Sequence, residues 1–169
     1  MKRTILILAA IIIGLSMSAQ IQNKFLGFTL GSTTKSEIYN KYKNAELLKV
    51  DEMGDISVGN LVFADTRWDF TTFNFYNNIL YSVQFSLSEE LTSLALMNSA
   101  WDSFNTKLWN KYSDYYIANN STSEMKIYID GKIGLSLFYM GEPFRRIMGL
   151  QYLDINLYLQ RSQAADDEL

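Results

Sequence analysis

The side chains that most often carry out catalysis are missing from this sequence. Its 169 residues include no histidine and no cysteine. Ser–His and Cys–His nucleophile pairs are therefore excluded, and so are most zinc sites, which use these residues as ligands. The chain also lacks a glycine-rich phosphate-binding loop. Any catalysis would depend on carboxylates, lysines and hydroxyl groups, and we expect no cofactor.

Two groups of acidic residues remain as candidates for chemistry. Asp51, Glu52 and Asp55 lie in one polar loop, and carboxylate oxygens are typical calcium ligands. Their spacing matches no calcium-binding loop, so we interpret them as a solvated turn and expect no metal. Asp65 and Asp69 could form the carboxylate pair of a glycosidase. Two acids do not define that geometry, so we interpret them as surface residues and expect no catalytic site.

Aromatic residues are the most unusual part of the composition, with 10 Phe, 11 Tyr and 3 Trp. Most of them fall on faces that we expect to be core. A second set falls on the opposite, outer face of the expected strands, where an exposed apolar patch would mark an interaction site. The alternative is that loops or a second copy cover this set. The candidate partner-binding residues are Phe73, Phe75, Tyr128, Phe138, Tyr152 and Tyr158.

An amphipathic helix over residues 88–113 organises the elements that would position these aromatics. Ser88 is its expected N-cap, and Glu89 and Glu90 would lie favourably in its first turn. Because strand-like sequence flanks the helix on both sides, we expect an antiparallel sheet packed against its apolar stripe. The stripe recurs at spacings of three, four and seven and consists of Leu91, Leu94, Trp101, Phe104, Leu108 and Tyr112.

Two tight turns predict the register of the strands before this helix. A turn at Asp65–Thr66 would pair Phe63 with Trp68, and a type I′ turn at Asn77–Asn78 would pair Phe70 with Phe85. Both turns place the same side chains inward, and a one-residue slip would invert them. The predicted inward set is Phe63, Trp68, Phe70, Phe85 and Leu87, with Tyr81 on the same side and Ser82, Gln84 and Ser86 facing water.

The rest of the chain predicts one more helix and further strands. Thr34 and Glu37 form a capping box, so a short helix should start there and end near Asn44. A three-residue loop over 129–131 would pair Ile127 with Ile133 and place the apolar residues of the next hairpin on one buried face. A two-residue Asp–Gly turn would distribute them over both faces. A last strand over 150–159 would turn Leu153, Ile155, Leu157 and Leu159 inward.

These elements predict the α+β class in the order α-β-β-β-α-β-β-β. We expect an antiparallel sheet of about six to eight strands with two helices packed on one face. The domain would cover residues 20–160 in two similar halves, about 20–87 and 88–160. Residues 161–169 would form a flexible acidic tail.

Residues 1–19 have the layout of a secretory signal peptide. A charged start, an apolar run over 5–15 and small residues precede an expected cleavage site after Ala19. The run is shorter than the roughly 20 residues of a membrane-spanning helix, although an uncleaved anchor is the alternative. An exported chain without cysteine favours a bacterial periplasm or cell exterior. The net charge of −3 without a basic stripe argues against nucleic acid and anionic membranes.

The sequence from Leu30 to Ile38, LGSTTKSEI, resembles the opening of two related groups of bacterial envelope domains. These are the β-lactamase-inhibitor-protein-like fold and the small outer-membrane assembly lipoproteins. The glycine, the capped helix start and the following three-stranded meander carry the resemblance. It implies a two-helix α+β sandwich that binds other envelope proteins and has no catalytic residue. The chain departs from the pattern in having no lipidation cysteine and no Gly-x-Pro after the first helix.

We therefore expect a non-enzymatic exported module that binds another envelope protein through its outer sheet face or its Asn77–Asn78 tip. One alternative is a binder of a small apolar or carbohydrate ligand between helix and sheet. A less favoured alternative is a metal-independent hydrolase using Asp65 and Asp69.

Overall fold

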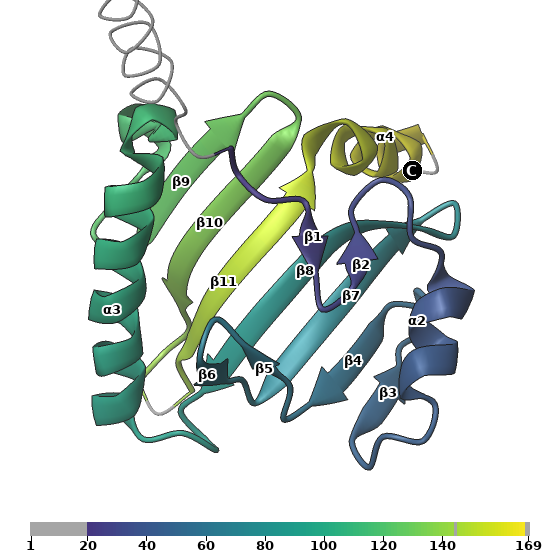
Figure 1. Cartoon of the computed structure of the whole chain (residues 1–169), viewed down its shortest axis with the longest axis horizontal. Helices are drawn as coiled ribbons and strands as arrows, with labels where there is room; N and C mark the ends of the chain where they lie inside the picture. Colours follow the sequence, from purple (N-terminus) through teal and green to yellow (C-terminus); the bar gives the residue numbers. More distant parts are fainter. Residues whose placement is uncertain (1–19, 144, 168–169) are drawn as a thin grey trace, which may run out of the picture.

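A seven-stranded antiparallel sheet forms the centre of the protein, which confirms the predicted α+β class (Figure 1). The computed structural model describes residues 20–143 and 145–167, so the predicted signal peptide lies outside the described residues. The sheet order is β3-β4-β7-β8-β11-β10-β9. In chain order these strands are β3 (Leu48–Val50), β4 (Ile56–Gly59), β7 (Phe70–Tyr76), β8 (Ile79–Ser88), β9 (Met125–Asp130), β10 (Ile133–Met140) and β11 (Ile147–Asp154).

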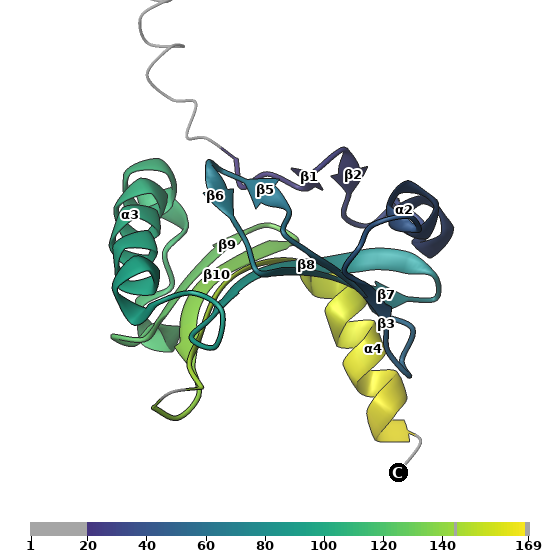
Figure 2. The ribbon, with the colours of Figure 1, turned by 90° about the horizontal axis from the view of Figure 1, so that it is seen from below.

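Within the described residues, two small hairpins and three α-helices surround this sheet. β1 (Lys24–Phe25) pairs with β2 (Phe28–Thr29), and β5 (Val62–Phe63) pairs with β6 (Thr66–Arg67). The helices are α2 (Lys35–Tyr42), α3 (Leu94–Tyr112) and α4 (Ile155–Asp167), and the 3₁₀ turns are η1 (Ser113–Tyr115) and η2 (Ala118–Asn120). Figure 2 shows α2, α3 and both hairpins on one side of the sheet, which we call the core face. The sheet arches over α4, which lies on the other side, the open face.

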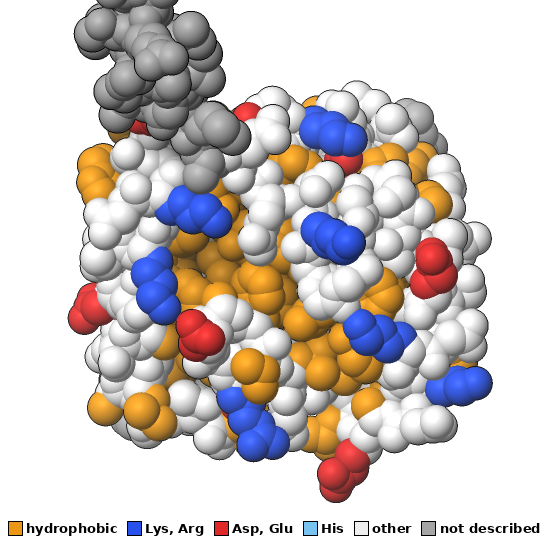
Figure 3. Space-filling model, viewed as in Figure 1, with side chains coloured by type: hydrophobic (Ala, Val, Ile, Leu, Met, Phe, Trp, Pro, Cys, Tyr) orange, Lys and Arg blue, Asp and Glu red, His pale blue; other side chains and the backbone are white. Residues whose placement is uncertain are grey.

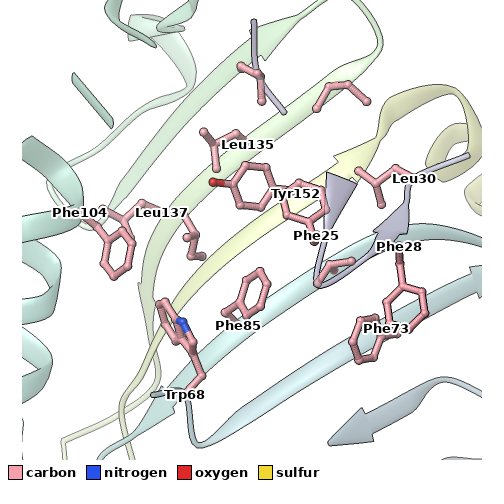
Figure 4. Packing of buried hydrophobic residues seen from close by; sticks show 14 of the residues in the cluster. Phe25, Phe28, Leu30, Trp68, Phe73, Phe85, Phe104, Leu135, Leu137 and Tyr152 are labelled. Carbon is pink, nitrogen blue, oxygen red and sulfur yellow. The ribbon is translucent and has the colours of Figure 1, made fainter. Parts of the chain in front are cut away.

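The hydrophobic core lies between the sheet and the elements on the core face (Figure 4). Trp68 is fully buried, donates its indole N–H to the carbonyl of Phe63 at 3.1 Å, and contacts Phe104 of α3 at 5.4 Å between ring centroids. Phe63 stacks on Phe85 at 4.2 Å. The predicted burial of these aromatics is confirmed for Trp68 and Phe85. Trp68 lies against the long helix as predicted, whereas Phe85 packs against Phe63 of the β5–β6 hairpin.

The capping box of α2 is formed as predicted. The Thr34 hydroxyl accepts from the amide of Glu37 at 3.4 Å, and the Glu37 carboxylate accepts from the amide of Thr34 at 2.7 Å. The side-chain and backbone hydrogen bonds from Thr34 lower the pKa of Glu37. The helix buries Ile38 against the sheet.

The long helix begins later than predicted. Its N-cap is Ser93, whose hydroxyl accepts from the amide of Leu96, whereas Ser88 ends β8. Asp69 explains this difference, because its carboxylate accepts from the amide of Ser88 at 2.8 Å and from the hydroxyl of Thr92 at 3.0 Å. The connection is thereby fixed as a turn. Leu91 is exposed, and the buried stripe consists of Met97, Phe104, Leu108 and Tyr112.

A β-bulge reverses the predicted faces of β7. The Asn77–Asn78 turn pairs Tyr76 with Ile79 as predicted, but the register shifts by one residue between Asn74 and Phe75. Beyond this point Phe70 pairs with Ser86 rather than with Phe85. Phe73 and Phe75 therefore point into the core, whereas Phe70 lies on the open face.

The other two hairpin loops also differ from the prediction. Ala64 and Asp65, both with positive φ, form the β5–β6 turn, so Phe63 pairs with Thr66 and not with Trp68. In the β9–β10 hairpin the loop is Gly131–Lys132, and Ile133 pairs with Asp130. Only the first of these two loop residues has positive φ, which is typical of a type II′ turn with glycine at that position.

The chain turns from strand to helix where one continuous strand was predicted. β11 ends at Asp154, whose carboxylate accepts from the amides of Asn156 at 3.1 Å and Leu157 at 3.2 Å and so caps the first turn of α4. The prediction of a strand over 150–159 is therefore wrong. Residues 161–167, predicted to belong to a flexible tail, continue the helix. The inward residues of β11 are Met148, Leu150, Tyr152 and Asp154.

Candidate partner-binding surfaces

Four of the six candidate binding residues belong to the hydrophobic core. Phe73, Phe75, Tyr128 and Tyr152 are buried on the core face, so they are unavailable to a partner. Tyr152 packs against Phe25 at 4.3 Å between ring centroids, and its burial raises the pKa of its hydroxyl.

The other two candidates, Phe138 and Tyr158, lie on the open-face side. Phe138 is nevertheless 4% exposed, because its ring lies over Gly149 of the neighbouring strand. Tyr158 is exposed on α4 and contacts Tyr81 at 6.4 Å. The Asn77–Asn78 tip is also exposed, but the carbonyl of Asn78 accepts from the amide of Lys35, which ties the tip to the start of α2.

The open face carries no charged side chain on six neighbouring strands of the sheet, which are β4, β7, β8, β11, β10 and β9. Directly paired residues share a face of an antiparallel sheet, so the register identifies its members. All are neutral, although 20% of the chain is charged. On β4, β7 and β8 they are Ser57, Gly59, Phe70, Thr72, Asn74, Tyr76, Ile79, Tyr81, Ser82, Gln84, Ser86 and Ser88. On β11, β10 and β9 they are Ile147, Gly149, Gln151, Leu153, Gly134, Ser136, Phe138, Met140, Met125, Ile127 and Ile129.

One half of the open face is a network of hydroxyl and amide groups. Gln151 donates to the Ser82 hydroxyl at 3.0 Å and so links β11 to β8. Gln84 donates to the Ser86 hydroxyl at 3.0 Å, and the hydroxyls of Ser57 and Thr72 lie 3.0 Å apart across β4 and β7. These bonds fix the side chains in place.

The other half of the open face is apolar and lies over β9, β10 and β11. Ile129, Met140 and Ile147 are 39%, 53% and 36% exposed. Of the described helices only α4 lies on this side. It contacts β7, β8 and β11, and Figure 2 shows it below β8 and β7 and away from β9. No helix among the described residues therefore covers the apolar half.

A buried polar cluster attaches α4 to the open face. Asp55, which is 5% exposed, accepts from the side chain of Asn74 at 2.8 Å, from the amide of Phe75 at 2.9 Å and from Arg161 of α4 at 3.3 Å. Arg161 also donates to the Tyr81 hydroxyl at 2.6 Å. Burial alone would lower the pKa of Arg161, but attraction and hydrogen bonds from Tyr81 and Asp55 outweigh it and raise that pKa. The reading of Asp55 as part of a solvated turn is therefore wrong.

The core face presents a different surface (Figure 3). Hydrophobic side chains are visible between α3 and the two hairpins, with Lys and Arg side chains spread around them. The floor residues Leu135 and Leu137 are nevertheless almost fully buried. Two cavities follow the line where α3 meets β9 and β10. They measure about 380 Å³ and 150 Å³.

The acidic residues form no metal-binding cluster in the part of the chain that the structure describes. No group of three potential ligands is close enough to hold a metal ion there. Asp65 lies exposed in the β5–β6 turn, whereas Asp69 holds the connection from β8 to α3. Within residues 20–143 and 145–167, no helix has the length and hydropathy needed to cross a membrane.

Comparison with protein-family models, with curated proteins and with solved structures gives no match. The resemblance of the LGSTTKSEI segment to envelope domains therefore stays an interpretation of the sequence.

Proposed function

We propose that this protein is an exported, non-enzymatic binding module that holds a partner protein of the bacterial envelope on its open face. The observation that carries the proposal is the absence of charge from the six strands of this face. Charged side chains are depleted at the centres of protein interfaces, because burying them is costly. An ordinary water-facing sheet has no such constraint.

The shape and polarity of the open face indicate what kind of partner surface would bind there. The sheet arches (Figure 2), so a convex element such as a helix or a rounded loop would lie inside the arch beside α4. Apolar side chains of the partner would cover Ile129, Met140 and Ile147. Its hydroxyl or amide groups would meet Gln151 and Gln84.

The proposal is tested by placing a charge on the open face. A periplasmic extract is cross-linked to the mature domain, the partner is identified and purified, and its affinity is measured by calorimetry. Met140→Lys and Ile129→Lys should each weaken binding at least tenfold, because the lysine ammonium would be desolvated in the interface. The purified mature chain should also begin at Gln20 by intact mass.

Val62→Lys is the matched control, because Val62 is exposed on β5, away from the open face. All three variants should keep the circular dichroism spectrum and melting temperature of the parent. Equal affinities for Met140→Lys and Val62→Lys would refute the open face as the binding surface.

A small-ligand binder is a second candidate function, and the cavities beside α3 favour it. A closed helix–sheet interface would have counted against this alternative. The two cavities give the interface open space that is lined by aromatic and polar side chains.

A further inference from the structure

One stripe of α3 alternates amide and indole side chains. Asn98, Trp101, Asn105 and Trp109 are spaced by three, four and four residues, so they lie along one side of the helix. This stripe lies next to the buried stripe that contains Phe104, and Trp101 packs against the core at their border. Trp101 is half-buried and Trp109 is 52% exposed, so part of each ring faces solvent.

The sheet supplies a second wall opposite this stripe. Lys126 and Tyr128 of β9 pair with Leu137 and Leu135, which places them on the core face, toward α3. Glu124 lies two residues before Lys126 and therefore on the same face, and its carbonyl accepts from the amide of Tyr139 at 2.8 Å. The smaller cavity lies between these two walls, and the larger one extends from them to the end of β10 and the loop that follows it. We call the groove that contains both cavities the α3 seam.

The larger cavity contains an aromatic pair and charges without partners. Trp101 and Tyr139 lie 5.2 Å apart between ring centroids, and the Tyr139 hydroxyl donates to the Asn98 side chain at 3.0 Å. Glu124 and Arg146 also line this cavity. Among the described residues, neither of these two side chains has a hydrogen-bond or ion-pair partner.

The smaller cavity contains a buried hydroxyl that lacks a partner. Trp109 packs on Tyr116 at 5.4 Å, and Tyr116 packs on Tyr128 at 5.4 Å. Tyr128 lines the cavity and has no exposed surface, yet its hydroxyl makes no hydrogen bond to any residue that the structure describes. Buried hydroxyls nearly always have a partner. Asn105 and Lys126 add further polar groups to the same cavity.

We propose that the α3 seam binds a short, linear, predominantly neutral oligosaccharide. A pyranose ring has an apolar C–H face that stacks on an indole or phenol ring, and hydroxyls at its edge that pair with amides and carboxylates. The seam repeats this combination twice. Trp101 and Trp109 are separated by eight residues, or about 12 Å along the helix axis, which matches two or three linked sugars. The Tyr128 hydroxyl and the charges of Glu124 and Arg146 provide hydrogen-bonding groups along the chain of sugars.

A peptide fits the seam less well than a sugar. An extended peptide gains most of its affinity by adding a strand to a free sheet edge. The edge of β9 beside the seam is already occupied, because Ile117 donates to the carbonyl of Ile127 and the Ser121 hydroxyl accepts from the amide of Ile127. Both main-chain groups of Ile127, in the middle of this edge, are thereby satisfied and closed to a peptide.

The test titrates the mature domain with chitotriose and with cellotriose, and follows tryptophan fluorescence and amide chemical shifts. We expect saturable binding of at least one trisaccharide, with shifts along α3 and β9. Trp109→Ala should weaken binding at least tenfold, whereas Trp109→Phe, which keeps a ring for stacking, should lose less. Tyr128→Phe should also weaken binding, because it removes the unpartnered hydroxyl.

Leu96→Ala is the control for a large exposed side chain on α3 outside the seam, and it should bind as the parent does. No binding of either sugar at millimolar concentration would overturn the proposal, and so would equal affinities for Trp109→Ala and Leu96→Ala. Saturable binding of trialanine in the seam without sugar binding would assign it to peptides and also refute the proposal. The seam and the open face lie on opposite sides of the sheet. Met140 also lines the larger cavity, so Ile129→Lys is the variant that separates the two proposals: it should weaken binding of the partner protein and leave trisaccharide binding unchanged.

Discussion

Replacing Arg161 with methionine should loosen α4 without unfolding the sheet. Arg161 is the residue through which the last helix reaches the Asp55 cluster on the first half of the sheet. Methionine keeps much of the side-chain volume and removes the charge and the hydrogen bonds. The carboxylate of Asp55 would then stay buried with two donors, from Asn74 and Phe75.

The magnitude follows from how deeply the pair is buried. Removing one partner of a fully buried ion pair costs about 3–5 kcal/mol. A quarter of the Arg161 side chain is exposed, and Asp55 keeps its other donors, so solvent and the remaining bonds reduce the effect. We expect a loss of about 1–2 kcal/mol in the free energy of unfolding. For a domain of this size that is a fall in melting temperature of roughly 2–8 °C.

Two measurements check this reasoning. Urea unfolding gives the stability change, and hydrogen exchange should show faster exchange in α4 with little change in β8 and β11. Arg145→Met is the control, because Arg145 is exposed in a loop. A double-mutant cycle with Asp55→Asn should give a coupling energy of the same order as the single loss. A stability loss no greater than that of Arg145→Met would refute the role of Arg161 as the anchor.

Two further predictions concern the open face and the first helix. Gly149→Ala would place a methyl group 2.2 Å from the Phe138 ring, so overpacking should lower the free energy of unfolding by about 1–3 kcal/mol. Adding Phe138→Leu should restore part of this stability in urea unfolding. Additive effects of the two substitutions would contradict the contact. Thr34→Ala should cost about 1 kcal/mol through the lost cap. Because the folded pKa of Glu37 is lowered, its stabilising contribution is present above the unfolded pKa of 4.5 and disappears as the pH falls through the folded value. Thr34→Ala should flatten this part of the stability–pH curve, and an unchanged curve would show that the capping box does not cause the shift.

The sequence predicted the elements better than their registers. Composition, alternation and the capping box at Thr34 were sufficient for the α+β class and for α2. The predicted pairing of β7 with β8 was wrong because one extra residue of β8, Tyr81, is inserted at the bulge. No turn rule signals that insertion. Tyr81 meets Arg161, which lies 80 residues further along the chain, so a long-range contact accompanies the local irregularity.

The wrong register also led to a wrong assignment of the candidate binding residues. A one-residue shift moves every side chain of a strand to the other face, so Phe73 and Phe75 were assigned to the surface while they fill the core. The absence of charge at alternate positions of β8, β10 and β11 is visible in the sequence and does not depend on register. The spacing of Asn98, Trp101, Asn105 and Trp109 is equally visible, but only the structure shows that cavities lie beside it.

The position of β11 in the sheet has a consequence for how the chain can fold during synthesis. β11 is the last strand to be made, yet it lies between β8 and β10. Until it emerges from the ribosome, the β3–β8 portion and the β9–β10 hairpin each expose an unpaired edge, and unpaired edges promote aggregation. A nascent or truncated chain that ends before Ile147 cannot join its two portions. We therefore expect that such a chain needs a chaperone to remain in solution, and that the domain folds only after β11 has been made.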